Sequence, residues 1–233
     1  MTQDADLGTA LDAIASTIGS KEIWPRYPGG YPGEVEAALL DSVFSLSAVY
    51  GSPKSGARAV VARWRKHVDR PLDSLSALVA DVDRAGGPEE FRAILKNNAI
   101  AVPNAKDQPT KAAAVYGVAR TLTEFGVDGA DDVRAKNADD PKGMYRAITK
   151  ERGVGEAGAT YFLMLLGIQG VKADVMIRRF VAKALGVSHV EPSQSRDFVV
   201  AAASALGVDL LSLDYALWDY ESRRSRRRRP GSN

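Results

Sequence analysis

Apolar residues recur at the spacing of an α-helix along most of this chain. Between residues 34 and 50, for example, Val35, Leu39, Val43 and Leu46 share one helical face, and Gly51 begins a stop signal. β-Branched residues, which favour strands, are scattered among alanines and leucines. We therefore predict an all-α protein of about ten short helices. The predicted helices span 34–50, 55–67, 73–84, 88–98, 109–125, 131–136, 141–150, 156–167, 174–185, 193–206 and 209–222.

Two glycines flank a valine at Gly153-Val154-Gly155, between the helices predicted at 141–150 and 156–167. Glycines in such a turn allow several backbone N–H groups to point outward together at the start of the next helix. Those N–H groups and the positive end of the helix dipole can bind a phosphate without any side chain. The turn is therefore a candidate anion site.

An isolated carboxylate, Asp174, opens the helix predicted at 174–185, and Arg178 and Arg179 follow in the same helix. A helix N-terminus favours the ionised form of an acid, which suits a charge stabiliser or a base. An anion-binding turn followed by a lone carboxylate and cations predicts an enzyme that acts on nucleic acid. A structural interpretation stays open, because Asp is also among the preferred N-cap residues.

Composition narrows the class of protein. The 233 residues are 45% hydrophobic and 26% charged, as in ordinary globular proteins. There is no cysteine, which excludes disulfides, cysteine-ligated zinc and an iron–sulfur cluster and fits a reducing cytoplasm. Residues 1–16 lack the basic and apolar segments of a secretory signal, and no apolar run approaches a membrane span. We expect a cytoplasmic, nucleoid-associated protein without a membrane partner.

Positive charge is concentrated at the C-terminal end. The net charge is +2, but six arginines between residues 223 and 229 contribute +6, which leaves −4 for the rest of the chain. Any nucleic-acid surface must therefore be local. We predict that residues 223–233 form a basic disordered tail that attracts polyanions without carrying chemistry.

The segment from residue 141 to Arg179 resembles the helix-hairpin-helix DNA glycosylase superfamily, which includes endonuclease III, the adenine glycosylase and the alkyl-base glycosylases. The family pattern is a Leu-Pro-Gly-Val-Gly hairpin, a helix, a loop, and an Asp followed by a helix with Arg. Gly153-Val154-Gly155 matches the hairpin, with Arg152 in place of the usual proline. Asp174 matches the family's Asp. Weaker similarities extend over 33–222, including the helix 34–50, Lys106 and Lys111 in 104–114, and the closing segment 213–218.

The resemblance implies a two-lobed helical bundle in which residues 1–222 form one catalytic unit, with the hairpin at 141–167 and a cleft between the lobes. It implies a monofunctional DNA glycosylase that flips an altered base out of the duplex and hydrolyses its N-glycosidic bond, leaving an abasic site. The Schiff-base lysine of bifunctional members corresponds here to Ala157. We expect a monomer without a cofactor, whose partner is double-stranded DNA containing an altered base.

Roles follow for individual residues. Asp174 is the predicted catalytic residue, because a carboxylate near C1′ stabilises a sugar with oxocarbenium character and can orient the attacking water. The base pocket is predicted from the end of helix 34–50, with Ser47 and Tyr50 ahead of Asp41 and Ser45. The predicted DNA-backbone contacts are Gly153, Val154, Gly155, Arg178 and Arg179, with Lys183 as an additional phosphate contact.

Other interpretations stay open. The chain could be a non-catalytic DNA-binding protein, or an all-α protein-interaction domain in which residues 151–155 merely form a corner. Asp214 and Asp219 are rival carboxylates, which we interpret as structural. His67 and His189 are too isolated to predict a metal site. The sequence does not separate modified pyrimidines, alkylated purines, oxidised guanine and uracil as the excised base.

Overall fold

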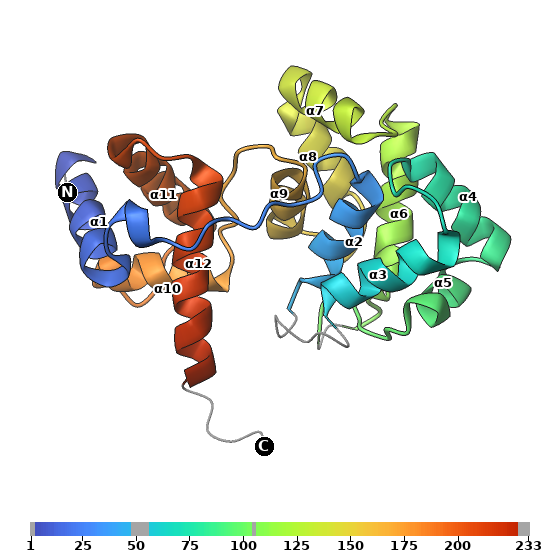
Figure 1. The fold of residues 1–233 in the computed structure, drawn as a ribbon, viewed down its shortest axis with the longest axis horizontal. Helices are drawn as coiled ribbons and strands as arrows, with labels where there is room; N and C mark the ends of the chain where they lie inside the picture. The colour runs from blue at the N-terminus through green and yellow to red at the C-terminus, as the bar shows by residue number, and fades with distance from the viewer. Residues whose placement is uncertain (1–2, 48–55, 104–105, 228–233) are drawn as a thin grey trace. The chain divides into compact units, whose positions relative to one another are not determined.

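The computed structural model describes residues 3–47, 56–103 and 106–227, and the regular structure within these residues is helical. It contains twelve α-helices and a short 3-10 helix, η1 (Lys21–Ile23), with one isolated bridge between Ile100 and Thr110. The predicted all-α class is confirmed. The chain divides into two compact units, which Figure 1 shows as separate groups of helices: unit 1 comprises residues 1–28 and 169–233, and unit 2 comprises residues 29–168.

Unit 2 is built around α2 (Val35–Phe44), every residue of which is buried. This helix packs against α3, α6 and α9. Trp64, Phe91 and Phe162 are the largest fully buried side chains of the surrounding core. The other helices of the unit are α3 (Ala57–Val68), α4 (Leu75–Ala85), α5 (Pro88–Leu95), α6 (Lys111–Glu124), α7 (Ala130–Asp139), α8 (Pro141–Thr149) and α9 (Glu156–Leu165).

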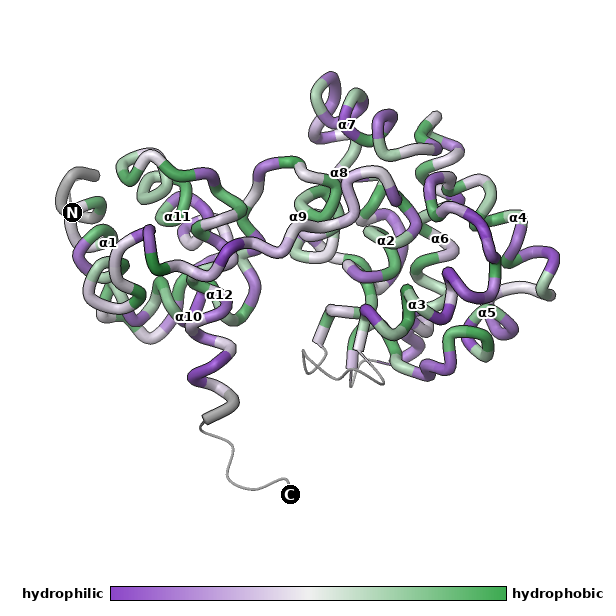
Figure 2. Tube along the Cα trace, in the orientation of Figure 1, coloured by the Kyte–Doolittle hydropathy of each residue, from purple (hydrophilic) through white to green (hydrophobic). Residues whose placement is uncertain are grey.

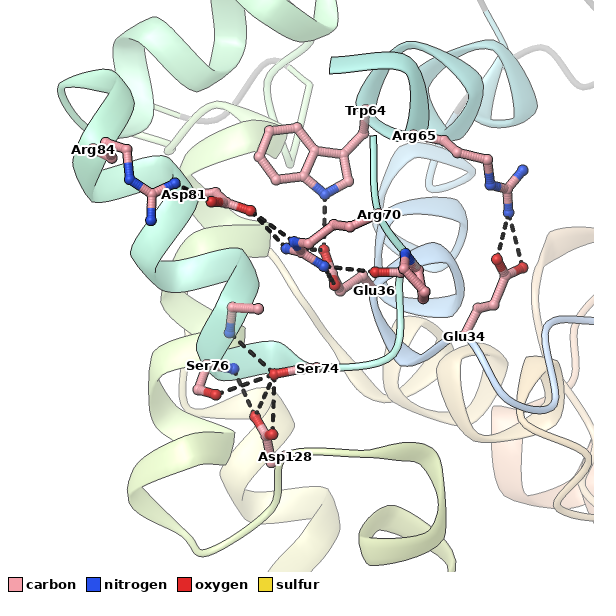
Figure 3. Close-up of polar contacts among 12 residues, drawn as sticks. Glu34, Glu36, Trp64, Arg65, Arg70, Ser74, Ser76, Asp81, Arg84 and Asp128 are labelled. Atoms are coloured by element: carbon pink, nitrogen blue, oxygen red, sulfur yellow. Dashed lines mark hydrogen bonds and ion pairs between the residues drawn. The ribbon is translucent and has the colours of Figure 1, made fainter. Parts of the chain in front are cut away.

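A buried charge near the start of α2 is satisfied by a polar network (Figure 3). Glu36 is 0% exposed, and it accepts hydrogen bonds from Trp64 Nε1 at 2.8 Å and from Arg70 Nη1 at 2.6 Å. The same Arg70 guanidinium binds Asp81 of α4, with 2.7 Å between Nη2 and Oδ2. Burial raises the pKa of Glu36, opposed by its bonds to Arg70 and Trp64. The network fixes one end of the central helix to α3 and α4.

Unit 1 is a second, smaller helical bundle with its own core. It contains α1 (Gln3–Ile18), α10 (Val175–Ala184), α11 (Pro192–Leu206) and α12 (Leu210–Arg227), in addition to η1. Helix α12 packs against α1, α10 and α11. The core side chains include Ile14, Ile177, Phe180, Val199, Leu213 and Leu217.

Helix α5 ends at Leu95 instead of residue 98, and α7 ends at Asp139 instead of residue 136; three larger differences from the prediction concern α1, α2 and α12. Helix α1 was not predicted, although Leu7, Ala10, Leu11 and Ile14 follow helical spacing. Helix α2 ends at Phe44 instead of continuing to residue 50, because the chain turns there and Ser47 adopts a φ of 51°. Residues 48–50 of the predicted helix lie outside the described residues.

The third difference is at the C-terminal end, where α12 continues through Arg227 (Figure 2 shows this hydrophilic stretch). Arg223 pairs with Asp219 at 2.8 Å and Arg224 with Glu221 at 3.3 Å, and such pairs one turn apart stabilise a helix. The prediction of a disordered tail from residue 223 is therefore wrong for 223–227. Residues 228–233 lie outside the described part of the chain.

Within residues 3–47, 56–103 and 106–227, no single helix is both long and apolar enough to cross a membrane. Helices α11 and α12 meet the same criteria only as a pair bent by 116°.

Candidate functional site

The turn at residues 151–155 joins α8 to α9, and the two helices pack against each other. Tyr145 of α8 and Thr160 of α9 share a hydrogen bond of 3.0 Å between their hydroxyl oxygens. The turn itself is held from inside: Val154 is buried, and Glu151 accepts a hydrogen bond of 2.8 Å from the Thr121 hydroxyl of α6. The predicted residues Gly153, Val154 and Gly155 thus lie on a rigidly anchored connection.

The two glycines of the turn differ in whether the fold requires a glycine at their position. Gly153 has a φ of +93°, and a Cβ at this position would lie only 2.2 Å from the Cβ of Ala101. Gly155 has an extended backbone and is exposed, and a Cβ added there would meet open space. The fold itself therefore requires a glycine at 153 but not at 155.

We expect Gly153→Ala to destabilise the protein. The left-handed backbone costs an alanine about 1–2 kcal/mol, and the clash with Ala101 adds about 1–3 kcal/mol. Urea unfolding of the variant should show a loss within the sum of these ranges, while Gly155→Ala serves as the matched control and should change the unfolding free energy little. Equal effects at both positions would contradict this account of the turn.

Gly155 leaves the start of α9 without a side-chain cap. Helices α4, α6, α8 and α10 are instead capped by the side chains of Ser74, Thr110, Asp140 and Asp174. The first N–H groups of a helix have no partner within the helix, so an anion can bind them. Arg152, noted in the sequence only as a departure from a family pattern, is exposed in this turn and adds positive charge, although Glu156 beside it is exposed as well.

Asp174 is the N-cap of α10. Its Oδ1 accepts hydrogen bonds from the N–H groups of Met176 at 2.8 Å and Ile177 at 3.3 Å. Its Oδ2 lies 3.9 Å from Lys172 Nζ, and the Asp174 side chain is 19% exposed. The interpretation of Asp174 as a helix N-cap is thus confirmed. The capping hydrogen bonds use only one of its two carboxylate oxygens.

A second carboxyl group interacts with Asp174 and was interpreted in the sequence as merely structural. Asp214 of α12 is buried, and its Oδ1 accepts a hydrogen bond of 3.0 Å from the backbone N–H of Lys172. Burial raises the pKa of Asp214 to about 8, and the negative charge of Asp174 contributes to the increase while Lys172 opposes it. Asp174 and Asp214 therefore interact with the same residue of unit 1, since Asp174 faces the Lys172 ammonium group and Asp214 binds the Lys172 backbone. Asp219, the other rival carboxylate, pairs with Arg223 instead.

The cations predicted to contact phosphates are not equivalent. Arg178 donates from Nε to the Val190 carbonyl at 3.0 Å and contacts the ring of His189, so it holds the loop before α11. Arg179 is exposed and donates to the Ser225 hydroxyl at 2.9 Å. Lys183 is exposed, with Nζ 5.9 Å from the centre of the Tyr220 ring. Arg179 and Lys183 are thus the more accessible cations of α10.

The predicted base-pocket residues lie at the end of α2, in unit 2. Asp41 is buried and accepts hydrogen bonds of 2.9 Å from both Tyr31 Oη and Ser45 Oγ. Burial and the charge of Asp41 raise the pKa of Tyr31. Ser47 is exposed in the turn that follows, whereas Tyr50 lies outside the described residues. Asp41 is therefore a satisfied internal group, and Ser47 is the exposed polar residue among the predicted pocket residues that the structure describes.

This turn is tied to unit 2 by a buried lysine. Lys111 Nζ donates to the carbonyls of Phe44, at 3.1 Å, and Leu46. Burial lowers the pKa of Lys111 to about 8. The Leu46 side chain lies beside α9, because a Cβ at Gly158 would come within 3.2 Å of it. The Ser47 turn and the first turn of α9 are therefore neighbours.

Among the described residues, no group of three or more acidic or histidine side chains is placed to hold a metal ion.

Comparison with known proteins assigns the chain to a family. Residues 9–222 match the model of a family described as "Domain of unknown function (DUF8548)", so the chain belongs to that family over nearly its whole length. No curated protein matches the chain.

Proposed function

We propose that this DUF8548 protein is a monofunctional DNA glycosylase, which flips an altered base out of a duplex and hydrolyses its N-glycosidic bond. The observation that supports this most is the fixed carboxylate of Asp174: the backbone of α10 holds one oxygen, and the other lies 3.9 Å from Lys172 Nζ in a side chain that is 19% exposed. The resemblance of residues 141–179 to the helix-hairpin-helix glycosylases adds the uncapped, glycine-led start of α9 as the backbone-binding element.

In the proposed reaction, the bond between the base and C1′ breaks as positive charge develops on the sugar. A fixed carboxylate stabilises that charge without having to reorganise, and it can accept the proton of the attacking water. Asp174 meets the first requirement because two backbone N–H groups hold it. The products are the free base and an abasic site. Flipping the base costs a few kcal/mol of unstacking, which is smallest for a mispaired or damaged base.

The family's nucleophile position and the two lysines with internal partners favour a mechanism without a covalent intermediate. The family's nucleophile position is Ala157, and Lys111 is held by two backbone carbonyls. The ammonium group of Lys172 lies in an ion pair with Asp174. We therefore propose that the protein cleaves the glycosidic bond only and leaves the DNA strand intact.

A panel of duplexes tests the proposed function directly. Each duplex carries one uracil, oxidised guanine, alkylated purine or modified pyrimidine, and strand scission is scored with and without alkali. We expect scission of one class of duplex only after alkali, because an abasic site is alkali-labile. Scission without alkali, together with borohydride trapping of the protein on DNA, would contradict the monofunctional proposal. An uncleaved panel would contradict the glycosylase proposal as a whole.

We expect Gly155→Ala to weaken DNA binding without unfolding the protein. A Cβ at 155 has room within the protein but would stand where a phosphate approaches the N–H groups of α9. Loss of one charge-assisted hydrogen bond corresponds to about 1.5–3 kcal/mol, or roughly ten- to hundred-fold in Kd. Fluorescence anisotropy with a duplex containing an abasic-site analogue measures this, with Gly33→Ala as the control, because Gly33 is exposed and a Cβ added there also meets open space. An unchanged Kd would remove the turn from the proposed interface.

A non-catalytic DNA-binding protein is the second candidate, and one observation favours it. The capping bonds of Asp174 are a sufficient structural reason for an acid at this position. The two proposals differ in the outcome of the duplex panel, because a pure binder forms no alkali-labile site.

A further inference from the structure

The loop at residues 169–174, which leads to Asp174, is attached to α12 at two levels. Gln169 Oε1 accepts hydrogen bonds from the N–H groups of Leu210, at 3.0 Å, and Leu211, at 3.4 Å. One turn further along α12, Asp214 accepts the hydrogen bond from the Lys172 N–H. The first attachment caps the N-terminus of α12. The second brings the buried Asp214 carboxyl group against the backbone of the loop that ends at Asp174.

The side chains around this second attachment form a compact charged cluster. Asp214 is 6% exposed, and the side chains of Lys172 and Asp174 are 13% and 19% exposed. Lys172 belongs to both interactions, since its backbone binds Asp214 and its ammonium group lies 3.9 Å from Asp174. Asp174 at the start of α10 and Lys172 in the loop are the charged groups that act on Asp214. Lys172 thus interacts with both acids, with Asp174 through its ammonium group and with Asp214 through its backbone N–H.

The protonation of the cluster follows from its burial. With the pKa of Asp214 raised to about 8, first by burial and then by Asp174, Asp214 is mainly a neutral acid at pH 7. Asp174, with a partly exposed side chain, suits a reacting group, and the buried Asp214 suits a support.

We infer that Asp214 is a positioning residue, whose buried carboxyl group holds the 169–174 loop through the Lys172 N–H group and so fixes the position of Asp174. The inference rests on the proposed function, in which Asp174 is the catalytic carboxylate. When Asp214 loses its proton, two like charges repel each other in a poorly solvated place and the loop shifts. A displacement of about 1 Å in a reacting group can lower a rate about 100-fold.

The pH dependence of single-turnover hydrolysis tests the inference, with the duplex that the panel identifies as substrate. We expect the wild-type rate to fall about ten-fold from pH 7 to pH 9, as Asp214 ionises around its pKa of about 8. Asp214→Asn retains the acceptor oxygen but cannot ionise, so its rate, normalised to its own value at pH 7, should stay flat across this range. Asp214→Ala removes the acceptor, and we expect a rate about ten- to hundred-fold lower at every pH.

Asp219→Asn is the matched control, because Asp219 lies on the same helix but pairs with Arg223. It should keep the alkaline fall of the wild type. A fall that persists unchanged in Asp214→Asn would overturn the inference while the glycosylase proposal stands.

A second measurement needs no DNA and therefore separates the two proposals. In a carboxyl-carbon NMR titration of the wild type, we expect Asp214 to titrate near pH 8, and to titrate lower in Asp174→Asn, because the charge of Asp174 is then gone. A carboxyl group that titrates below about pH 5 would overturn the inference, whatever the duplex panel shows. If Asp214 titrates near pH 8 in a protein that cleaves no duplex, the glycosylase proposal fails and the catalytic part of the inference fails with it.

Discussion

Asp174→Asn is expected to lose nearly all hydrolytic activity and to keep its fold. A positioned carboxylate that acts as a base contributes about 10²–10⁴-fold to a rate, and an amide can neither balance a sugar cation nor accept a proton. The asparagine oxygen can still accept the hydrogen bonds from the Met176 and Ile177 N–H groups, and Asn caps helices about as well as Asp. Single-turnover rates and urea unfolding on the same preparation measure both effects.

DNA binding supplies the internal control for this variant. The affinity for a duplex with an abasic-site analogue should be unchanged or higher, because a negative charge near phosphates has been removed. Asp174→Ala loses the cap as well, so it should cost about 1 kcal/mol of stability that Asp174→Asn does not. If Asp174→Asn hydrolyses its substrate at the wild-type rate, Asp174 is a cap alone and another group of the protein supplies the catalysis.

The sequence predicted helices best where local chemistry marks their ends. Pro141 at the first turn of α8 and the glycines of the 151–155 turn placed α8 and α9 to within two residues. At the end of α2, the apolar spacing that continues to Leu46 indicated a longer helix. Leu46 is apolar because it lies against α9 in the folded unit, so tertiary packing produced a helical pattern without a helix.

Arginine content misled the prediction at the other end of the chain. Six arginines indicated disorder, but Arg223 and Arg224 pair with acids one turn earlier, and arginine is itself a good helix former. The sequence showed the charges but not that their partners, Asp219 and Glu221, lie on the same side of one helix. Counting residue spacings of three and four would have revealed this.

Of the two acids in the candidate site, only the partly exposed Asp174 could be predicted from the sequence. Asp174 was found because a helix-opening acid after a glycine turn is a local signal. Asp214 was not, because its significance depends on burial beside Asp174 and on the N–H group of a residue far away in the sequence. Arg178 and Arg179 were equivalent as sequence, yet only the structure shows that Arg178 binds the Val190 carbonyl.

Removing the charge of Arg70 is expected to have the largest effect on stability. Arg70→Met leaves the fully buried Glu36 without a cationic partner, bound only by the neutral Trp64 indole and the Ser74 backbone, and it also unpairs Asp81 from that side. Breaking a buried ion pair at one partner costs about 3–5 kcal/mol. Arg84→Met is the matched control: Arg84 also pairs with Asp81, but its side chain is 74% exposed, so the loss should stay within about 1 kcal/mol. Urea unfolding at pH 7 compares the two.

The pH dependence of this loss identifies its cause. Burial already raises the pKa of Glu36, and without Arg70 the pKa rises further, so the folded variant takes up a proton that the unfolded chain releases near pH 4.5. The stability of Arg70→Met should therefore increase as the pH falls from 7 towards 5, and its deficit relative to the wild type should shrink. Adding Glu36→Gln to Arg70→Met should restore part of the stability at pH 7, because no buried charge is left unpaired. A deficit that is independent of pH and of Glu36→Gln would mean that Arg70 acts through packing, and that its ion pair does not secure the central helix of unit 2.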